Sequence, residues 1–390
     1  PAPWGEGRTA PSRRGGGWVR PRAMAQTRPG VYFCQQAARR VSPVPGGDGG
    51  RHRFMVGTCS LQRKNEVHLV EFSEETAEVV LQQVLPHADE MWQLSVSPTD
   101  ARRVLTYASG KAGGPGALRL WRAGDRGAQE GRLELLSSLQ QDDTEAPLGP
   151  VKSLLWDPHH EGNVLVAGAE TVQVFQCTQG KMTRVSALQA EPGRGHELTR
   201  CHAACLDPHH PQQVSTVDDT HLKTWDLRSS RLAFRRDNAH LFGARDVDYN
   251  PNVPYQVLTA GEDAVLRFWD LRNSSKCLLA LSGGHHHWIV HARYNHHHDQ
   301  LVLSCGADSA VCLWRAGSVA SQPLGSSCAA GEDGASRPPD GLIQRFEEHE
   351  DSIYSCCWSA TDAWAFASVS YDGKLVVNRV PGEEKYRILL

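Results

Sequence analysis

The sequence predicts an all-β fold in which seven similar sheet units form a closed ring, preceded by a disordered tail. One set of four residue types returns four times with the same offsets along the chain. Successive sets begin 44, 45 and 64 residues apart, a spacing that fits one small sheet per repeat. Short apolar runs separated by turn residues recur along the chain, as expected for the strands of such sheets.

Each set starts with a His, which is followed by a Ser or Thr 19 positions later, an Asp 23 positions later and, in three sets, a Trp 29 positions later. The four sets are His196, Ser215, Asp219 and Trp225; His240, Thr259, Asp263 and Trp269; His285, Ser304, Asp308 and Trp314; and His349, Ser368, Asp372 and Asn378. A period of about 40–45 residues with Gly-His early and Trp-Asp late is typical of WD40 blades. We therefore expect a seven-bladed WD40 β-propeller.

The offsets have a structural explanation. The Asp of each set falls in a tight turn between two apolar runs, where its side chain can bond to nearby backbone. The His comes from the loop that enters the blade, so a hydrogen-bonded chain of Asp, His, Ser or Thr and Trp would join this loop to the sheet. Repetition of the set in four blades favours a structural role, because an active site normally occurs once.

The predicted domain boundaries follow from composition. Residues 1–30 are expected to be a disordered, basic N-terminal extension, because they are rich in Pro, Gly and Arg. Residues 31–390 are expected to form the propeller. Segment 316–346 falls in the longer 64-residue interval and adds about twenty residues, so we expect a flexible inserted loop there. The apolar end at 385–390 is expected to be an outer strand.

The first three blades are less regular than the others. An early strand is expected at 31–33, before the paired strands of the first blade. The second blade, at 87–121, has a Gly-rich loop at 110–116 in place of the Asp turn. The third blade has Ala169 where the Asp is expected and Phe175 where the Trp is expected, so we expect it to lack the polar chain.

Charge is distributed unevenly. The first 45 residues contain eight Arg and one Glu, a charge of +7, so with a net charge of −3 the remaining residues carry about −10. An acidic propeller after a short basic tail argues against nucleic acid as the main ligand. The eleven Cys are scattered without a repeating frame, which is typical of a reducing compartment. We see no apolar run long enough to span a membrane and no secretory signal.

The candidate chemistry is sparse. Pairs and triplets of His at 159–160, 209–210, 285–287 and 296–298 could suggest a metal site, but their equivalent loop positions favour ordinary solvated loops. No nucleophile elbow, phosphate-binding Gly loop or paired-His zinc motif is present. We therefore expect no catalytic residue, cofactor or metal. Trp288 and Trp364 lie near loops and are candidates for contacts with a partner protein, with core packing as the alternative.

Three stretches carry a more specific resemblance. Residues 286–301, 347–354 and 370–390, the last with Asn378 in place of Trp, resemble the EARP- and GARP-complex-interacting proteins, a WD40-repeat family. The likeness runs with gaps from about residue 31 to the C-terminus. The chain departs from the family in its Arg-rich first 23 residues, in loop 110–116, in Phe175 and Trp314, and in a less acidic segment 316–346.

The resemblance implies a non-enzymatic scaffold that binds subunits of the EARP and GARP tethering complexes. Such a protein would be cytoplasmic, associated with the trans-Golgi network and endosomes, and a monomeric propeller within a larger complex. It would support endosomal recycling, endosome-to-Golgi retrograde transport and dense-core vesicle cargo sorting. No direct membrane span and no nucleic-acid partner is expected.

Two other classes of function remain open. Residues 225–228 and 269–272 each read Trp-Asp-Leu-Arg, which resembles the W-D-x-R box of substrate receptors of cullin-RING ubiquitin ligases. Under that alternative, Arg228 and Arg272 would contact the ligase adaptor. The remaining class is an enzyme with a site in the central channel, for which the sequence nominates no residues.

Overall fold

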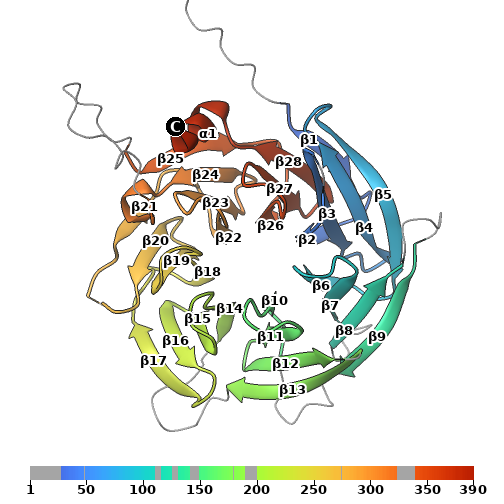
Figure 1. Ribbon diagram of the computed structural model, residues 1–390, viewed down its shortest axis with the longest axis horizontal. Coiled ribbons are helices and arrows are strands. Elements are labelled where there is room, and N and C mark those ends of the chain that lie inside the picture. The colour runs from blue at the N-terminus through green and yellow to red at the C-terminus, as the bar shows by residue number, and fades with distance from the viewer. Residues whose placement is uncertain are drawn as a thin grey trace, which may run out of the picture.

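The computed structural model describes residues 28–47, 49–109, 116–124, 131–140, 149–178, 180–188, 200–273, 275–322 and 339–390. In this part of the chain, seven antiparallel four-stranded sheets surround a central axis (Figure 1). The prediction of a seven-bladed propeller is confirmed. We number the blades from β2–β5, which is blade one, to the sheet of β26, β27, β28 and β1, which is blade seven.

The strands fall into four positions within a blade. The innermost strands are β2 (Ala38–Val44), β6 (Met91–Val96), β10 (Ser153–Trp156), β14 (Cys201–Leu206), β18 (Ala244–Tyr249), β22 (Ile289–Tyr294) and β26 (Ile353–Trp358). The second strands are β3 (Arg51–Thr58), β7 (Arg103–Ala108), β11 (Asn163–Ala167), β15 (Gln213–Asp218), β19 (Gln256–Gly261), β23 (Leu301–Gly306) and β27 (Ala365–Ser370). The third strands are β4 (Asn65–Ser73), β8 (Ala117–Ala123), β12 (Val172–Thr178), β16 (His221–Asp226), β20 (Leu266–Asp270), β24 (Val311–Arg315) and β28 (Lys374–Arg379). The outer strands are β5 (Glu78–His87), β9 (Leu133–Gln140), β13 (Lys181–Leu188), β17 (Arg231–Arg236), β21 (Leu279–Leu281), β25 (Gly341–Phe346) and β1 (Gly30–Phe33).

The hydrophobic core lies between neighbouring sheets. Strands β23 and β27 are buried at every residue, whereas outer strand β17 alternates between exposed and partly buried side chains. One apolar cluster joins β23 and β24 of blade six to β26 and β27 of blade seven, with Leu303 and Trp358 among its members. A blade cannot bury both faces by itself, so each sheet is completed by its neighbours in the ring.

The ring is closed by the N-terminal strand. Strand β1 pairs antiparallel with β28, with Gly30 opposite Val377 and Phe33 opposite Lys374 (Figure 1). The strand predicted at 31–33 is therefore present, but it belongs to blade seven and not to blade one. Gly30 is already part of it, so the predicted extension 1–30 overlaps the propeller. Residues 1–27 lie outside the described residues.

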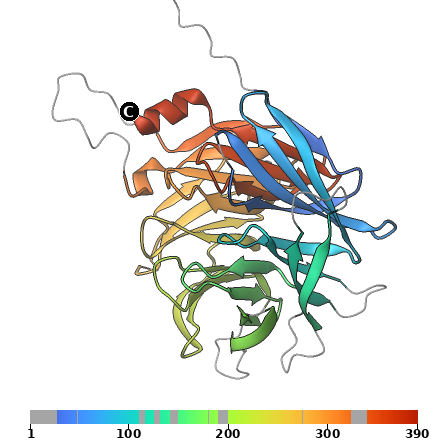
Figure 2. The same ribbon diagram turned by 45° about the vertical axis from the view of Figure 1, so that its right-hand side comes forward.

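The predicted outer strand at 385–390 is wrong. The chain forms helix α1 (Gly382–Leu389) against blades six and seven (Figure 2). The outer edge of β28 is already paired with β1, so no ladder position remains for this segment. Acidic Glu383 and Glu384 in the first turn and Arg387 in the last turn favour a helix, because they complement its dipole.

The insert predicted at 316–346 is ordered at both ends. The 3-10 helix η3 (Gly317–Val319) follows β24, and residues from Gly341 onward form β25, which pairs with β24. The flexible-loop prediction is therefore wrong for these ends, because blade six needs β25 as its fourth strand. Residues 323–338 lie outside the described residues.

The two faces of the ring differ in the elements they expose. Inner strand β18 begins at Ala244, opposite Gly261, and ends at Tyr249, opposite Val257. The turn from β19 to β20 therefore lies on the face where inner strands begin, which we call the upper face. The ends of inner and third strands, such as Asp270 of β20, lie on the lower face.

Candidate partner-binding site

Blade five contains the full hydrogen-bonded set. His240 Nδ1 lies 2.9 Å from Asp263 Oδ1, and His240 Nε2 lies 2.8 Å from Thr259 Oγ1. Trp269 Nε1 donates to the same Thr259 hydroxyl at 2.9 Å. The backbone N–H of Leu241 donates to Asp263 Oδ2 at 3.1 Å, so the set fixes the loop that enters the blade.

Blade six repeats this geometry. His285 Nδ1 lies 2.9 Å from Asp308 Oδ1 and His285 Nε2 lies 2.7 Å from Ser304 Oγ, to which Trp314 Nε1 donates at 2.7 Å. Burial alone would raise the pKa of Asp308, but the bond with His285, the His286 N–H and the charge of Arg345 lower it to about 2. The Asp is therefore an anion throughout the physiological range.

Blade four departs from the predicted set. Trp225 Nε1 donates to Thr216 Oγ1 at 2.9 Å, and not to the predicted Ser215, which contacts Thr224 and Tyr249 at 2.7 Å. The physical reason is a shorter hairpin, since nine positions separate the hydroxyl from the Trp here and ten in blade five.

The predicted Asp of blade four is also displaced. Asp219 is exposed in the turn with a φ of 51°, while Asp218 is buried and binds Lys223 Nζ at 2.6 Å. His196 lies outside the described residues, so its predicted contact is not described by the structure.

Blade seven replaces the direct His–Asp contact with a relay. His349 Nε2 lies 2.8 Å from Ser368 Oγ, but His349 Nδ1 lies 2.7 Å from Ser370 Oγ, which donates to Asp372. Asn378 does not reach Ser368 and its amide donates to Glu348 at 3.4 Å. The direct His349–Asp372 contact expected from the offsets is therefore absent.

The residue that ends the second strand explains this difference. Ser370 ends β27 at the position that Gly261 occupies in β19 and Gly306 in β23. A Cβ on Gly261 would lie 2.3 Å from His240 Nδ1, so glycine leaves room for the direct contact. The Ser370 side chain fills that space and carries the hydrogen bond itself.

Blade two contains a partial set that the sequence analysis missed. His87 Nε2 lies 3.2 Å from Thr106 Oγ1, and Trp121 Nε1 donates to Thr106 at 2.8 Å. The offset of 19 from His to Thr is the same as in the other sets. That offset was the available signal. The Trp follows the Thr by 15 positions here and by ten in blade five, which concealed the set. Residues 110–115 of the predicted Gly-rich loop lie outside the described residues.

Two of the predicted His pairs join neighbouring blades on the lower face. His159 Nε2 lies 2.8 Å from the carbonyl oxygen of Asp207, and His209 Nε2 lies 2.9 Å from that of Asn250. Each carbonyl belongs to the next blade. These pairs lie in loops, as expected, with His159 and His160 exposed and His209 and His210 partly buried, and one His of each pair also contacts the next blade.

The four predicted partner contacts lie on different faces. Trp288 is 44% exposed just before β22 on the upper face, with the Arg245 guanidinium 5.0 Å from its ring centroid. Leu241 and Phe242, on the corresponding loop of blade five, are 78% and 61% exposed. Together we call Leu241, Phe242 and Trp288 the upper apolar patch.

Trp364, by contrast, is only 9% exposed and belongs to the core cluster between blades six and seven. Its ring centroid lies 4.6 Å from that of His298, at a tilt of 31°, and 5.2 Å from Lys385 Nζ of α1. Its prediction as a partner contact is therefore wrong, because α1 and the core cover it. Arg228 and Arg272 are exposed and follow the third strands of blades four and five on the lower face.

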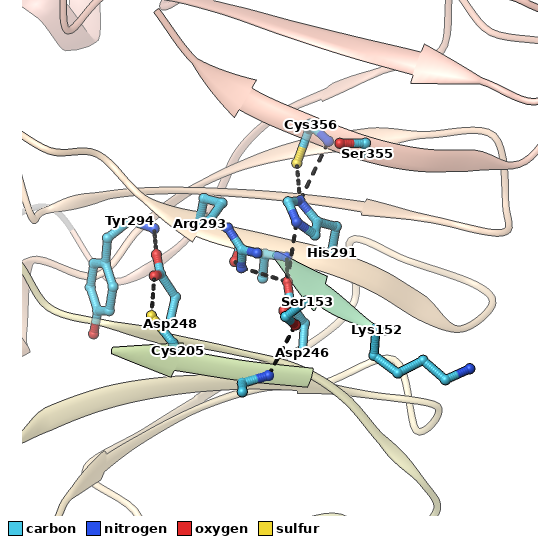
Figure 3. A network of polar contacts seen from close by, with 12 residues as sticks. Lys152, Ser153, Cys205, Asp246, Asp248, His291, Arg293, Tyr294, Ser355 and Cys356 are labelled. Carbon is cyan, nitrogen blue, oxygen red and sulfur yellow. Dashed lines mark hydrogen bonds and ion pairs between the residues drawn. The ribbon is translucent and has the colours of Figure 1, made fainter. Parts of the chain in front are cut away.

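The central channel contains a cavity of about 400 Å³ lined by inner strands of all seven blades. Side chains on one inner strand bond to backbone N–H groups of the next, as Figure 3 shows for Asp246 and Asp248. Asp246 accepts from the Ala292 N–H at 2.8 Å and from Arg293 at 2.6 Å, and Asp248 accepts from the Tyr294 N–H at 2.9 Å. This network joins blades five and six across the channel wall.

The same region brings a Cys, a His and an Asp together. Cys356 Sγ lies 3.7 Å from His291 Nδ1, and His291 Nε2 lies 3.8 Å from Asp246 (Figure 3). The Cys356 backbone N–H donates to Nδ1 at 3.4 Å, and burial together with Arg293 and Arg40 holds the pKa of His291 well below its usual range. These contacts occupy Nδ1 and weaken His291 as a base, which does not suit nucleophilic catalysis.

In the described part of the chain, two clusters have donor atoms close enough to hold a metal ion. His291, Cys305 and Cys356 form one, and His52, Glu74 and Asp362 the other; within each, the donor atoms lie within 4.8 Å of one another. In the first, burial raises the pKa of the Cys305 thiol well above its usual range, which disfavours the thiolate that a metal requires. In the second, His52 already bonds Ser359 at 2.9 Å and Glu74 at 3.1 Å.

Comparisons with known proteins place the chain in a family. A family model described as the EIPR1 beta-propeller matches residues 28–314, and a WD domain, G-beta repeat model matches residues 341–377. The chain belongs to the EIPR1 beta-propeller family. This confirms the resemblance inferred from residues 286–301, 347–354 and 370–390.

Several relatives match over nearly their whole length. EARP and GARP complex-interacting protein 1 of Homo sapiens is 34% identical over 94% of this chain and 100% of its own. The EARP-interacting protein homolog of Danio rerio is 35% identical over the same shares. WD repeat-containing protein DWA2 of Arabidopsis thaliana is 30% identical over 90% of this chain and 95% of its own.

Among the described residues, none of the helices has the length and apolar character that crossing a membrane would require.

Proposed function

We propose that this propeller is a non-enzymatic adaptor that binds subunits of the EARP and GARP tethering complexes. The names of the relatives support the proposal, because the human protein is an interactor of both complexes and the zebrafish protein an interactor of EARP. Its contribution would be to hold partner segments on a rigid ring. The His–Asp contacts recur in blades five and six, which fits a structural device better than an active site.

The upper apolar patch is the observation that carries this proposal. Leu241, Phe242 and Trp288 expose large apolar side chains on adjacent blades of the same face of the ring. An exposed Trp next to an Arg is typical of the anchors that dominate protein–protein binding, and neighbouring exposed apolar groups often mark such a site. The loops that carry them are held by hydrogen bonds to Asp263 and Asp308. Because these loops are ordered before binding, a partner does not have to supply the free energy of ordering them.

The cellular role follows from the partners. As an EARP- and GARP-binding propeller, the protein would act in the cytoplasm, at endosomes and the trans-Golgi network. It would support endosomal recycling, endosome-to-Golgi retrograde transport and dense-core vesicle cargo sorting. The chain would enter the larger assembly as a single propeller, with direct contact to neither nucleic acid nor the interior of a membrane.

Affinity purification with mass spectrometry tests the proposal. Tagged wild-type chain should recover EARP and GARP subunits, whereas the double variant Phe242→Ala and Trp288→Ala should recover at least tenfold less, on the order of a 1–2 kcal/mol loss. The double variant Arg228→Ala and Arg272→Ala, on the lower face, is the control and should behave as wild type. Failure of the wild-type chain to recover any tether subunit would refute the proposal.

A second candidate function rests on the lower face. Arg228 and Arg272 are exposed at equivalent positions of adjacent blades, as expected for a substrate receptor of a cullin-RING ubiquitin ligase. Arg272 is held by Asp270 through bonds of 2.9 and 2.8 Å, so its exposed edge has a fixed orientation. The same purification decides between the two: this candidate predicts that a ligase adaptor is recovered by wild type and lost with the Arg variants.

A further inference from the structure

A ring of bulged residues surrounds the upper mouth of the channel. In six blades the pairing of the innermost strand skips one residue near its start, and these residues are Arg39, Trp92, His202, Arg245, Val290 and Tyr354. In blade three Lys152 stands at the corresponding place, where its N–H donates to Ala167 at 2.7 Å. A bulge redirects the side chain it carries. The innermost strands surround the axis, so these seven residues form one circle (Figure 1).

Within this circle, Arg39 lies between two aromatic rings. Its guanidinium lies 4.3 Å from the ring centroid of Trp92 and 4.8 Å from that of Tyr354, so two rings from neighbouring blades enclose it. Within the described part of the chain the Arg39 guanidinium makes no hydrogen bond or ion pair. Stacking fixes the plane of the group while leaving its N–H edge available, which suits recognition of a carboxylate.

The other side of the circle is also basic. Lys152, His202 and Arg245 come from three consecutive blades, and exposed Arg200 precedes β14. Among the described residues Lys152 Nζ has no hydrogen-bond or ion-pair partner, and Figure 3 shows its side chain extending away from the Asp246 network. Burial, followed by the charges of Arg200, Arg39 and Arg245, lowers the pKa of Lys152.

Few acidic groups balance these cations. Glu262 forms an ion pair with Arg245, and Glu90 accepts from Ser109 at 3.1 Å. Below the mouth, Asp246 is engaged by Arg293 at 2.6 Å. The Ser109 hydroxyl is neutral, so Glu90 keeps its charge. The four cations Arg39, Lys152, Arg200 and Arg245 still outnumber the two anions Glu90 and Glu262 in a chain whose net charge is −3. Like charges gathered at a partly enclosed mouth focus the electrostatic potential and attract an anion.

We propose that the upper mouth of the channel binds an acidic segment of a partner protein, with its carboxylates at Arg39, Lys152 and Arg200 and an apolar side chain on Trp288. Because the mouth is positively charged, it favours a negatively charged ligand. The spread of the basic groups over several blades, and the contact of Arg245 with Trp288, favour an extended peptide over a small anion. The upper apolar patch and the mouth then form one continuous binding surface.

An acidic segment at the mouth specifies the chemistry of the partner in the proposed function. It rests on the proposed function only in assuming that the chain acts by binding proteins. A synthetic peptide tests the mouth without any tether subunit, so failure here leaves the tether proposal standing, and the reverse also holds. The probe is a fluorescein-labelled peptide of Glu residues with one central Leu, measured by fluorescence anisotropy against the full chain at low ionic strength. Its Lys-for-Glu counterpart is the peptide control.

We expect the acidic peptide to bind and the basic peptide not to bind, with affinity falling as salt is added. Arg39→Ala should weaken binding about tenfold, and Arg39→Lys should recover only part of it because Lys lacks the planar stacking group. Lys152→Ala, whose side chain supports no described contact, tests the same mouth without risk to the fold. Arg272→Ala on the lower face is the matched control, and thermal unfolding verifies that each variant is folded.

Three results would overturn the inference. One is the absence of acidic-peptide binding at low salt. Another is binding that Arg39→Ala and Lys152→Ala both leave unchanged. The third is tight binding of inositol hexakisphosphate at the mouth with no binding of the peptide, which would assign the mouth to a small polyanion.

Discussion

His240 and Asp263 lie 2.9 Å apart although 23 residues separate them, and their contact holds the loop that carries part of the upper apolar patch. Asp263 also accepts from the Leu241 N–H and from Arg267 at 2.6 Å. Burial opposes the charge on Asp263, but these donors hold the pKa of its carboxyl well below the ordinary value. The buried Asp263 carboxylate therefore stabilises the blade through His240 and also holds the loop of the proposed binding surface through the Leu241 N–H.

Asp263→Ala is expected to lower the free energy of unfolding by about 2–4 kcal/mol, because it leaves His240 and Arg267 without their acceptor. Chemical denaturation at pH 7 measures the change. Asp219→Asn is the matched control, since sequence offsets place it at the same position while the structure places it exposed in a turn. The control should change stability by less than about 0.5 kcal/mol, and equal losses in the two variants would contradict the difference between blades four and five.

Stability should decrease in mild acid, in part through His349. Burial lowers its pKa from 6.5 to about 4, with Lys374 acting in the same direction and Asp372 opposing it; Ser368 and Ser370 contact its two nitrogens. Between these two pKa values the unfolded chain takes up a proton that the folded chain does not. The contribution of His349 to the free energy of unfolding is therefore fully present above about pH 6.5. It falls by up to about 3 kcal/mol as the pH drops to about 4.

His349→Gln should reduce the slope of unfolding free energy against pH over this range, whatever its effect at pH 7. Urea denaturation at several pH values gives that slope. His87 and His240 also have lowered pKa values, so part of the slope should remain. An unchanged slope in the variant would show that His349 is protonated equally in both states.

Thr106→Val tests the partial set of blade two. The substitution keeps the shape of the side chain but leaves Trp121 Nε1 and His87 Nε2 without the shared hydroxyl. We expect a loss of about 1–3 kcal/mol, because both nitrogens are shielded from water. Thermal or chemical unfolding measures it, with exposed Thr99→Val as the control. A neutral Thr106→Val would mean that blade two does not depend on the set.

Closure of the ring by β1 can be tested at Tyr32. Its hydroxyl lies 2.8 Å from His68 Nδ1 of blade one, and its ring packs on the cluster between blades one and seven. Tyr32→Phe should cost about 1 kcal/mol through the lost hydrogen bond, and Tyr32→Ala about 3 kcal/mol through lost packing. Denaturant titration distinguishes the two. If Tyr32→Ala were as stable as Tyr32→Phe, the packing of β1 would not contribute to closure.

The sequence alone determined the repeat and much of each blade. The offset of 19 between His and Ser or Thr, and the Asp turn that follows, are contacts within a single sheet and its entering loop. Their geometry depends on a short chain segment, and so the spacing of residues predicts it. Blades five and six follow that pattern closely.

Only the tertiary structure decided the features that depend on hairpin length and on ring closure. One residue fewer in the β15–β16 hairpin moves the hydroxyl from Ser215 to Thr216, and Ser370 in place of a glycine converts a direct contact into a relay. The pairing of β1 with β28 leaves the C-terminal segment to form a helix that covers Trp364. The circle of Arg39, Lys152 and Arg245 joins residues from blades far apart in sequence, because closing the ring brings the innermost strands around one axis.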